Sequence, residues 1–209
     1  MTHESQLEEK LQRVSFATLG HFLEEGFVSH EVRSLLNNVK VFGRAATVKV
    51  ANFSAYAINQ ALATLQENDV LIIDMQGDHQ HACVGTVTAC AAAAKGARAI
   101  VVDGVVTDIV ELRAAGLPIF ARGTSLLTTK LNLESASELN VAVSCGGISV
   151  QPGDWVLGDD NGLLILPAEN LLEVIDIALG SDAAEPDVLQ RLRSKEPVER
   201  VLRLPHQST

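Results

Sequence analysis

Aromatic and basic residues are both scarce in this sequence. Aromatics make up only 4% of its 209 residues, so aliphatic and small side chains have to fill the core. Lys and Arg number 16 against 26 Asp and Glu, giving a formal net charge of -10. A broad nucleic-acid surface needs clustered basic residues and is therefore not expected.

Long apolar runs and paired cysteines are also missing. No stretch approaches the roughly 18 apolar residues of a membrane span, and the charged residues 1–13 do not resemble a signal peptide. We therefore expect a cytoplasmic protein with no membrane partner. Cys83, Cys90 and Cys145 form no CxxC pair, which argues against a disulfide framework or a zinc knuckle and favours buried free thiols.

The apolar residues that are present, 47% of the chain, exclude a disordered protein and follow a regular order. Continuous or alternating apolar runs predict strands, and 3.6-residue periodicity or Ala-rich composition predicts helices between them. Strands are expected at 45–50, 70–74, 99–103 and 117–121, and helices at 54–65, 82–95 and 108–115. This alternation is typical of parallel βαβ units.

The two ends of the chain have a different pattern. Helices are expected at 4–24 and 30–38, short antiparallel strands at 140–145, 155–158 and 163–166, and amphipathic helices at 168–179 and 182–193. With no repeat and no linker, we expect one α/β domain over residues 1–180, with a C-terminal helical extension over 181–209.

Polar residues follow two of the predicted strands, in segments 74–81 and 103–108. Ligands of parallel sheets collect beyond the carboxyl ends of strands, and neighbouring strands would place these two loops side by side. Asp108 either caps the following helix or ligates a hard divalent cation such as Mg²⁺. Gly77-Asp78 forms either a simple turn or an anion site at a helix start.

Three basic side chains near these loops have two interpretations each. His79 and His81 are either a metal pair or hydrogen-bonded surface residues, since no third ligand stands at a standard spacing. Arg122 follows a predicted strand end and either binds a carboxylate or is solvated. No GxSxG, Walker A or GxGxxG pattern is present.

The motifs together resemble those of the RraA-like family. This family includes the regulator of ribonuclease E activity and the divalent-metal 4-hydroxy-4-methyl-2-oxoglutarate / 4-carboxy-4-hydroxy-2-oxoadipate aldolases. The resemblance covers about 43–167 and rests on segments 43–48 (GRAATV), 69–74 (DVLIID), 101–108 (VVDGVVTD), 117–123 (LPIFARG), 150–155 (VQPGDW) and 158–162 (GDDNG), and on Gly77-Asp78 with Ala82 and Gly85. It implies an αββα sandwich of the swivelling β/β/α type, with mixed sheets around a parallel βαβ core, assembled as a homotrimer or a hexamer.

The resemblance also implies site residues. Aldolase members carry an acidic residue that supports a metal-bound water, then an Arg-Asp pair whose Arg binds the substrate and whose Asp holds Mg²⁺ or Mn²⁺. In this sequence the metal-binding Asp falls on Asp108, but the Arg position is Thr107 and the acidic position is Thr86. The backbone amides of Val87 and Thr88 match those that contact the substrate carboxylate.

We therefore expect a lyase that uses Mg²⁺ or Mn²⁺ to cleave or decarboxylate a small 2-oxo acid, giving pyruvate. Asp108 would hold the metal, and Asp78, His79 or His81 would position water or move the proton. A threonine at position 107 cannot supply a bidentate cation, so Arg122, His79, His81 or Lys130 would have to replace it. The alternatives are a non-catalytic regulator that binds a ribonuclease, and a diverged enzyme on the same scaffold.

Overall fold

The computed structural model describes residues 3–133 and 136–202. By contacts, the chain divides into a unit of Glu24–Asn170 and a unit formed by Met1–Leu23 with Leu171–Thr209. This division differs from the expected boundary at residue 180, which falls inside a helix. Among the described residues, no helix is long and apolar enough to cross a membrane.

The Glu24–Asn170 unit is a mixed α/β fold around one large sheet. Its strand order is β1-β6-β4-β3-β2-β11-β12, and β8 pairs with β2. The elements are β1 (Arg33–Ser34), β2 (Lys40–Lys49), α3 (Ala55–Thr64), β3 (Asp69–Asp74), α4 (Thr86–Ala94), β4 (Ala99–Asp103), β5 (Val105–Val106), α5 (Ile109–Ala115), β6 (Ile119–Ala121), β7 (Gly123–Thr124), β8 (Glu138–Leu139), β9 (Val143–Cys145), β10 (Ile148–Val150), β11 (Trp155–Asp159) and β12 (Gly162–Leu166).

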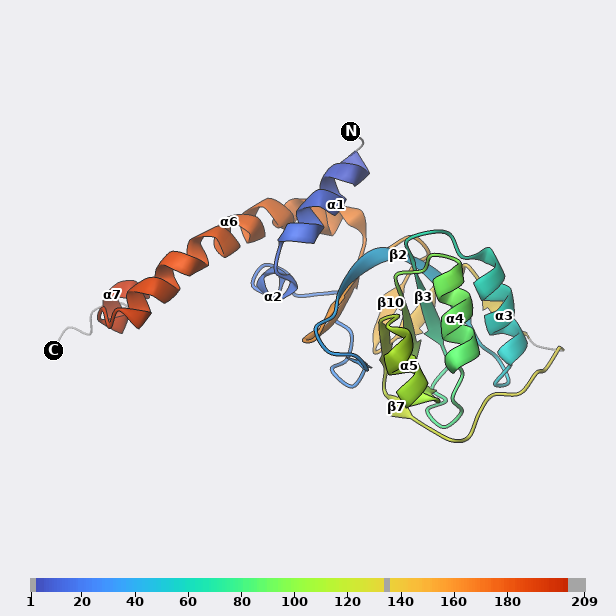
Figure 1. Cartoon of the computed structure of the whole chain (residues 1–209). Coiled ribbons are helices and arrows are strands. Elements are labelled where there is room, and N and C mark those ends of the chain that lie inside the picture. The colour runs from blue at the N-terminus through green and yellow to red at the C-terminus, as the bar shows by residue number, and fades with distance from the viewer. Residues whose placement is uncertain (1–2, 134–135, 203–209) are drawn as a thin grey trace. The chain divides into compact units, whose positions relative to one another are not determined.

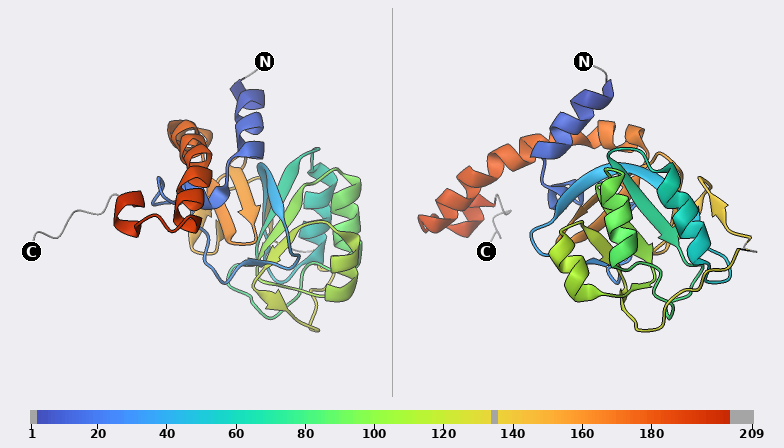
Figure 2. Two further views of the ribbon diagram at one scale, coloured as in Figure 1. Left: turned by 60° about the vertical axis from the view of Figure 1, so that its left-hand side comes forward. Right: turned by 45° about the vertical axis from the view of Figure 1, so that its right-hand side comes forward.

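The parallel core predicted from the sequence is confirmed. Strands β2, β3, β4 and β6 pair in parallel, while β11 and β12 add antiparallel strands. Helices α3, α4 and α5 lie side by side on one face of the sheet (Figure 1). The left view of Figure 2 shows these three helices together on one side of it. Because β3 and β4 are buried on both faces, their apolar runs are continuous rather than alternating.

Two hydrophobic clusters fill the two faces. Val48, Ile73 and Val102 point to the helix side, where Ala89 and Leu112 pack against them. The opposite face carries Val70, Ile72, Val101 and Phe120, and the β9–β10 hairpin covers it with Val143, Cys145 and Val150. Small alanines on α4 fit the scarcity of aromatic side chains.

Several helix predictions differ from the structure in existence or in bounds. Residues 30–38 contain β1 and no helix, because Arg33 and Ser34 pair with β6. The helix expected over 82–95 starts only at Thr86, since the amides of Ala82 and Cys83 bond to Leu127 and Val105. The two helices expected over 168–193 form one, α6 (Ala168–Arg193), with Pro186 inside it.

The second unit contains α1 (His3–Arg13), α2 (Phe16–Leu19), most of α6, and α7 (Val198–Val201). The single helix expected over 4–24 is broken at Ser15, whose backbone is extended and whose N–H donates to Asp182 at 2.7 Å. The Thr18 hydroxyl donates to the same carboxylate, and Lys10 pairs with Asp176 at 2.6 Å.

Gly158 lies where β11 crosses the core. A Cβ atom at this position would stand 2.6 Å from Cζ of Phe120 and 2.9 Å from Cδ2 of Leu163. We expect Gly158→Ala to destabilise the protein by about 1–3 kcal/mol through overpacking. Gly180→Ala is the matched control: it lies in α6 with no atom near its Cβ position, and should be neutral or slightly stabilising. Thermal unfolding of both variants measures the difference, and equal shifts would contradict it.

Candidate active site

Asp108 lies between β5 and α5 in the left-handed conformation, with φ at 54°. Its side chain makes no capping hydrogen bond to α5, so the cap interpretation is wrong. Instead Oδ2 accepts the backbone N–H of Thr86 at 2.9 Å and the Thr86 hydroxyl at 3.1 Å. The Thr107 hydroxyl is 3.3 Å from Oδ1. A residue in a strained conformation is held there by its surroundings. For Asp108 these are Thr86 and Thr107, which stand at the acidic and the Arg positions of the aldolase pattern.

The Asp108 carboxylate is exposed and ionised. The N–H of Thr86 lowers its pKa most; slight desolvation opposes this, and the two threonine hydroxyls lower it further. Gly85 makes the close approach possible, because a Cβ there would stand 2.6 Å from Oδ2 of Asp108. Any side chain at position 85 would therefore displace the carboxylate from α4.

Helix α4 begins beside this carboxylate. The Thr86 N–H is taken by Asp108, and Val87 and Thr88 follow in the first turn, where amides lack helical partners. Val87 is 84% exposed. The amides expected to meet a substrate carboxylate thus belong to the helical turn whose first N–H binds Asp108.

The donor set around Asp108 fits a magnesium-type cation held largely by water. An ionised, exposed carboxylate flanked by two hydroxyls offers hard oxygen atoms, and Mg²⁺ takes one or two carboxylates and keeps several waters. Among the described residues, no group of three or more His, Cys, Asp or Glu is placed to hold a metal. The described residues therefore offer no tight all-protein cage of such ligands.

His81 and Asp78 form a second group. Nδ1 of His81 is 2.6 Å from Oδ2 of Asp78, and the imidazole stacks on Phe53 with ring centroids 4.2 Å apart. Desolvation alone would raise the pKa of Asp78, but N–H groups of Gln80 and His81 and the His81 imidazole outweigh it, so the pKa is lowered. The Gly77-Asp78 segment is thus a turn whose carboxylate orients a histidine.

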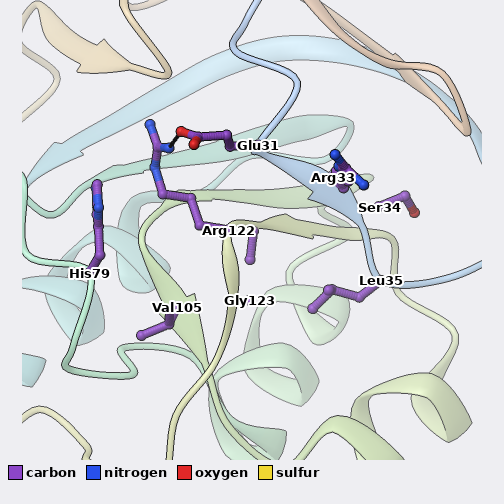
Figure 3. Close-up of a pocket in the computed structure, with 9 residues that line it drawn as sticks. Glu31, Arg33, Ser34, Leu35, His79, Val105, Arg122 and Gly123 are labelled. Atoms are coloured by element: carbon purple, nitrogen blue, oxygen red, sulfur yellow. Dashed lines mark hydrogen bonds and ion pairs between the residues drawn. The ribbon is translucent and has the colours of Figure 1, made fainter.

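Arg122 and His79 belong to a third group, around Asp103. Nε of Arg122 donates to Oδ1 of Asp103 at 2.5 Å, and Nη1 pairs with Glu31. Nε2 of His79 lies 3.9 Å from Oδ1 of Asp103. Figure 3 shows Arg122 between His79 and Glu31, beside a cavity of about 610 Å³ that Arg33 and Val105 also line. Partial burial would lower the pKa of Arg122, but the carboxylates of Asp103 and Glu31 raise it.

The structure therefore divides the predicted residues into three groups. Thr86, Thr107 and Asp108 are bonded together, Asp78 and His81 form a pair, and His79 and Arg122 share Asp103. Within the described part of the chain, no hydrogen bond or ion pair joins Asp108 to either other group. Lys130 contacts the Thr128 hydroxyl at 3.5 Å instead.

Sequence reasoning did not assign roles to Asp74 and Asp103, which are both buried. Asp74 accepts the N–H groups of Gln76 and Ser144, and Asp103 accepts that of Gly146. The signal was available in part, since each Asp ends a buried strand, as the sequence shows. The sequence did not show that the β9–β10 hairpin would place its amides against these two carboxylates.

The cysteines show different exposure. Cys83 and Cys145 are buried and Cys90 is exposed. Burial raises the pKa of both buried thiols to about 12, so neither is a thiolate at neutral pH. We expect a thiol-specific disulfide reagent at pH 8 to label one of the three cysteines quickly in the folded protein and all three in denaturant. Rapid labelling of more than one thiol in the native state would contradict the structure.

Comparison with known proteins identifies the family. The family model RraA-like, described as Aldolase/RraA, matches residues 16–165. The chain belongs to the RraA-like family, as the motifs indicated. It is 35% identical over 145 residues to a "Putative 4-hydroxy-4-methyl-2-oxoglutarate aldolase" from Halalkalibacterium halodurans, covering 68% of each chain.

Two further comparisons extend this relationship. An uncharacterized protein of Methanocaldococcus jannaschii is 32% identical over 177 residues, with 83% of each chain covered. A crystal structure of RraAS2 from Streptomyces coelicolor, described as an unusual member of the RNase ES inhibitor RraA protein family, superposes with a TM-score of 0.74 at 28% identity. The match covers 90% of this chain and 98% of that one. The RraA-like fold expected from the sequence is therefore confirmed.

Proposed function

We propose that the protein is a divalent-metal-dependent lyase that releases pyruvate from a small 4-hydroxy-2-oxo dicarboxylic acid, or from oxaloacetate by decarboxylation. The observation that carries the proposal is the Asp108 group: an ionised carboxylate turned away from its own helix and held beside the first turn of α4. The names of relatives as 4-hydroxy-4-methyl-2-oxoglutarate aldolases support the substrate class.

Each part of the Asp108 group has a role in this proposal. Asp108 holds Mg²⁺ or Mn²⁺, which when bound polarises the 2-keto group as a Lewis acid. The N–H groups of Val87 and Thr88 receive the substrate carboxylate at the positive end of α4. The Thr86 and Thr107 hydroxyls keep the Asp108 carboxylate in place through hydrogen bonds.

In the retro-aldol reaction the 4-hydroxyl proton leaves and the C3–C4 bond breaks, giving a carbonyl product and the enolate of pyruvate, which then takes a proton at C3. His81 is the best-prepared proton carrier of the residues considered, because Asp78 binds Nδ1 and leaves Nε2 available. Arg122 and His79 line another cavity, so we assign carboxylate binding to Val87 and Thr88.

The direct test follows pyruvate release. Purified protein is incubated with Mg²⁺ or Mn²⁺ and a panel of 4-hydroxy-2-oxo diacids and oxaloacetate, and pyruvate is measured with and without a chelator. We expect metal-dependent pyruvate from at least one of them. Pyruvate from none of these compounds would overturn the proposal.

Thr107 is the largest departure from the aldolase pattern. A missing charge-assisted contact to a developing enolate costs about 10²–10³ in rate. We expect Thr107→Arg to raise the 4-hydroxy-2-oxo diacid cleavage rate at least about tenfold, and Thr107→Val to give no such gain. Steady-state kinetics on the same panel measure both, and an unchanged rate in Thr107→Arg would show that position 107 does not limit this chemistry.

We also propose a homotrimer or a hexamer, as the family resemblance implies. Apolar side chains stand exposed on the segments that carry the Asp108 group or bond to it: Val87 at 84%, Val110 at 71% and Leu126 at 98%. Such side chains gathered near a polar site are typical of interfaces. Light scattering coupled to size exclusion should give a mass of three or six chains; a monomer would contradict this.

A ribonuclease regulator is the second candidate, favoured by the threonines at 86 and 107 and by the similarity to the Streptomyces member of the RNase ES inhibitor RraA protein family. It would act through an acidic surface. Co-purification with a ribonuclease, in a protein that yields no pyruvate, would favour this function over the lyase.

A further inference from the structure

Four charged residues form a row across the carboxyl ends of the parallel strands. Lys49 of β2 pairs in register with Asp74 of β3, and Asp74 pairs with Asp103 of β4. The pairing of Val101 with Phe120 continues the row to Arg122, which follows β6 and binds Asp103. Residues paired in register point to the same face, with neighbouring strands about 4.8 Å apart. The charges along this row are therefore positive, negative, negative and positive.

The row lies on the face away from the helices. It continues the register of Val70, Ile72, Val101 and Phe120, which belong to the cluster that the β9–β10 hairpin covers. A cavity of about 490 Å³ opens on it, lined by all four residues together with His79 and Ser144. Neither Thr86, Thr107 nor Asp108 lines this cavity, so it is a different site from the proposed lyase centre.

Of these four residues, Asp74 and Lys49 can still bind a ligand beside their present partners. Asp74 is 6% exposed and accepts two backbone N–H groups, which leaves lone pairs on both carboxylate oxygens. Lys49 has one described ionic partner, Glu138 at 3.7 Å, and its three donors are only partly used. Arg122 is already bound by Asp103 and Glu31.

We propose that this cavity binds a small zwitterion, an α-amino acid, with its ammonium group on Asp74 and its carboxylate on Lys49. A dicarboxylate would meet the two adjacent carboxylates of Asp74 and Asp103. A simple amine would leave Lys49 without a counter-charge beyond Glu138. A molecule whose two charged groups are attached to one carbon matches the order of the row, and His79, 45% exposed at its side chain, stands at the cavity to contact the remainder.

The test is a binding panel on the full chain without added metal. Isothermal titration measures the common L-amino acids, with succinate and methylamine as controls that each carry charge of one sign only. At least one amino acid should bind with a dissociation constant in the millimolar range or tighter, and both controls should bind at least about tenfold more weakly. No binding by any amino acid, or equal binding of succinate or methylamine, would overturn the proposal.

Three variants locate the ligand. Lys49→Met should weaken binding at least about tenfold, and because Lys49 is partly exposed this variant should fold normally. Asp74→Asn should do the same if its hairpin contact holds. Lys95→Met, an exposed lysine at the end of α4, is the matched control and should bind as the parent does. Unchanged affinity in Lys49→Met would reject the site.

Asp108→Ala separates this proposal from the lyase. Amino-acid binding should be unchanged in Asp108→Ala, whatever the outcome of the pyruvate assay. Loss of binding in that variant would place the amino acid at the Asp108 group and overturn the assignment to the charged row.

Discussion

Asp108→Ala is expected to lower metal-dependent pyruvate release by at least about 10²–10³-fold, because it removes the only carboxylate that the proposal assigns to the cation. The N–H and hydroxyl of Thr86 would also lose their acceptor. The measurement is initial rate against Mn²⁺ or Mg²⁺ concentration on the substrate that the panel identifies.

Glu111→Gln is the control for this substitution. Glu111 lies in the first turn of α5, three residues from Asp108, and is exposed. The Glu111→Gln substitution removes the same charge without changing the Asp108 group, so we expect a rate close to that of the parent. A comparable loss in both variants would mean that the general negative potential, rather than Asp108, supports catalysis. Undiminished turnover in Asp108→Ala would remove Asp108 from the mechanism.

Asp103→Ala should produce the largest loss of stability. Asp103 is 9% exposed, and its two oxygens accept from Nε of Arg122 and from the N–H of Gly146. Removing one member of a buried ion pair costs about 3–5 kcal/mol, since the other charge stays behind. Because the Arg122 side chain keeps 16% exposure, we expect the lower end, about 3 kcal/mol. In a chain of this size that lowers Tm by roughly 6–12 °C.

Glu31→Gln is the matched comparison, because it removes the other carboxylate of the same arginine. The Glu31 side chain is 63% exposed, and exposed pairs contribute about 0–1 kcal/mol. Denaturant unfolding of both variants should therefore differ by about 2 kcal/mol or more. Equal losses would show that the Asp103 contacts do not stabilise the β9–β10 hairpin against the sheet.

The parallel core was predictable because burial on both faces requires an apolar sequence in each strand separately. Segments 70–74 and 99–103 are apolar without interruption up to their final aspartates, and that pattern alone identifies strands covered on both faces. Placing Asp74 and Asp103 at one sheet edge followed from the same reasoning, and the register confirms that they are neighbours.

The other features depended on contacts between residues far apart in the chain, and a single sequence does not show which residues make such contacts. The late start of α4 results from hydrogen bonds of Ala82 and Cys83 to residues more than twenty positions away. The left-handed backbone of Asp108 results from its bonds to Thr86, and local sequence favoured a simple cap. The helix predicted over 30–38 failed for a similar reason, since pairing with β6 outweighs local helical preference.

The extended segment 82–85 has a consequence for how this protein could have changed over time. Main-chain hydrogen bonds connect it to Val105, Thr107 and Leu127, while β5 pairs with β7, so three loops are joined by their backbones. Amide and carbonyl groups are the same in every residue except proline, so these hydrogen bonds do not depend on the side chains at 86 and 107. Substitutions at 86 and 107 could then alter the reaction without first unfolding the scaffold. The side chains that determine the reaction can therefore change independently of the main-chain hydrogen bonds that join these loops.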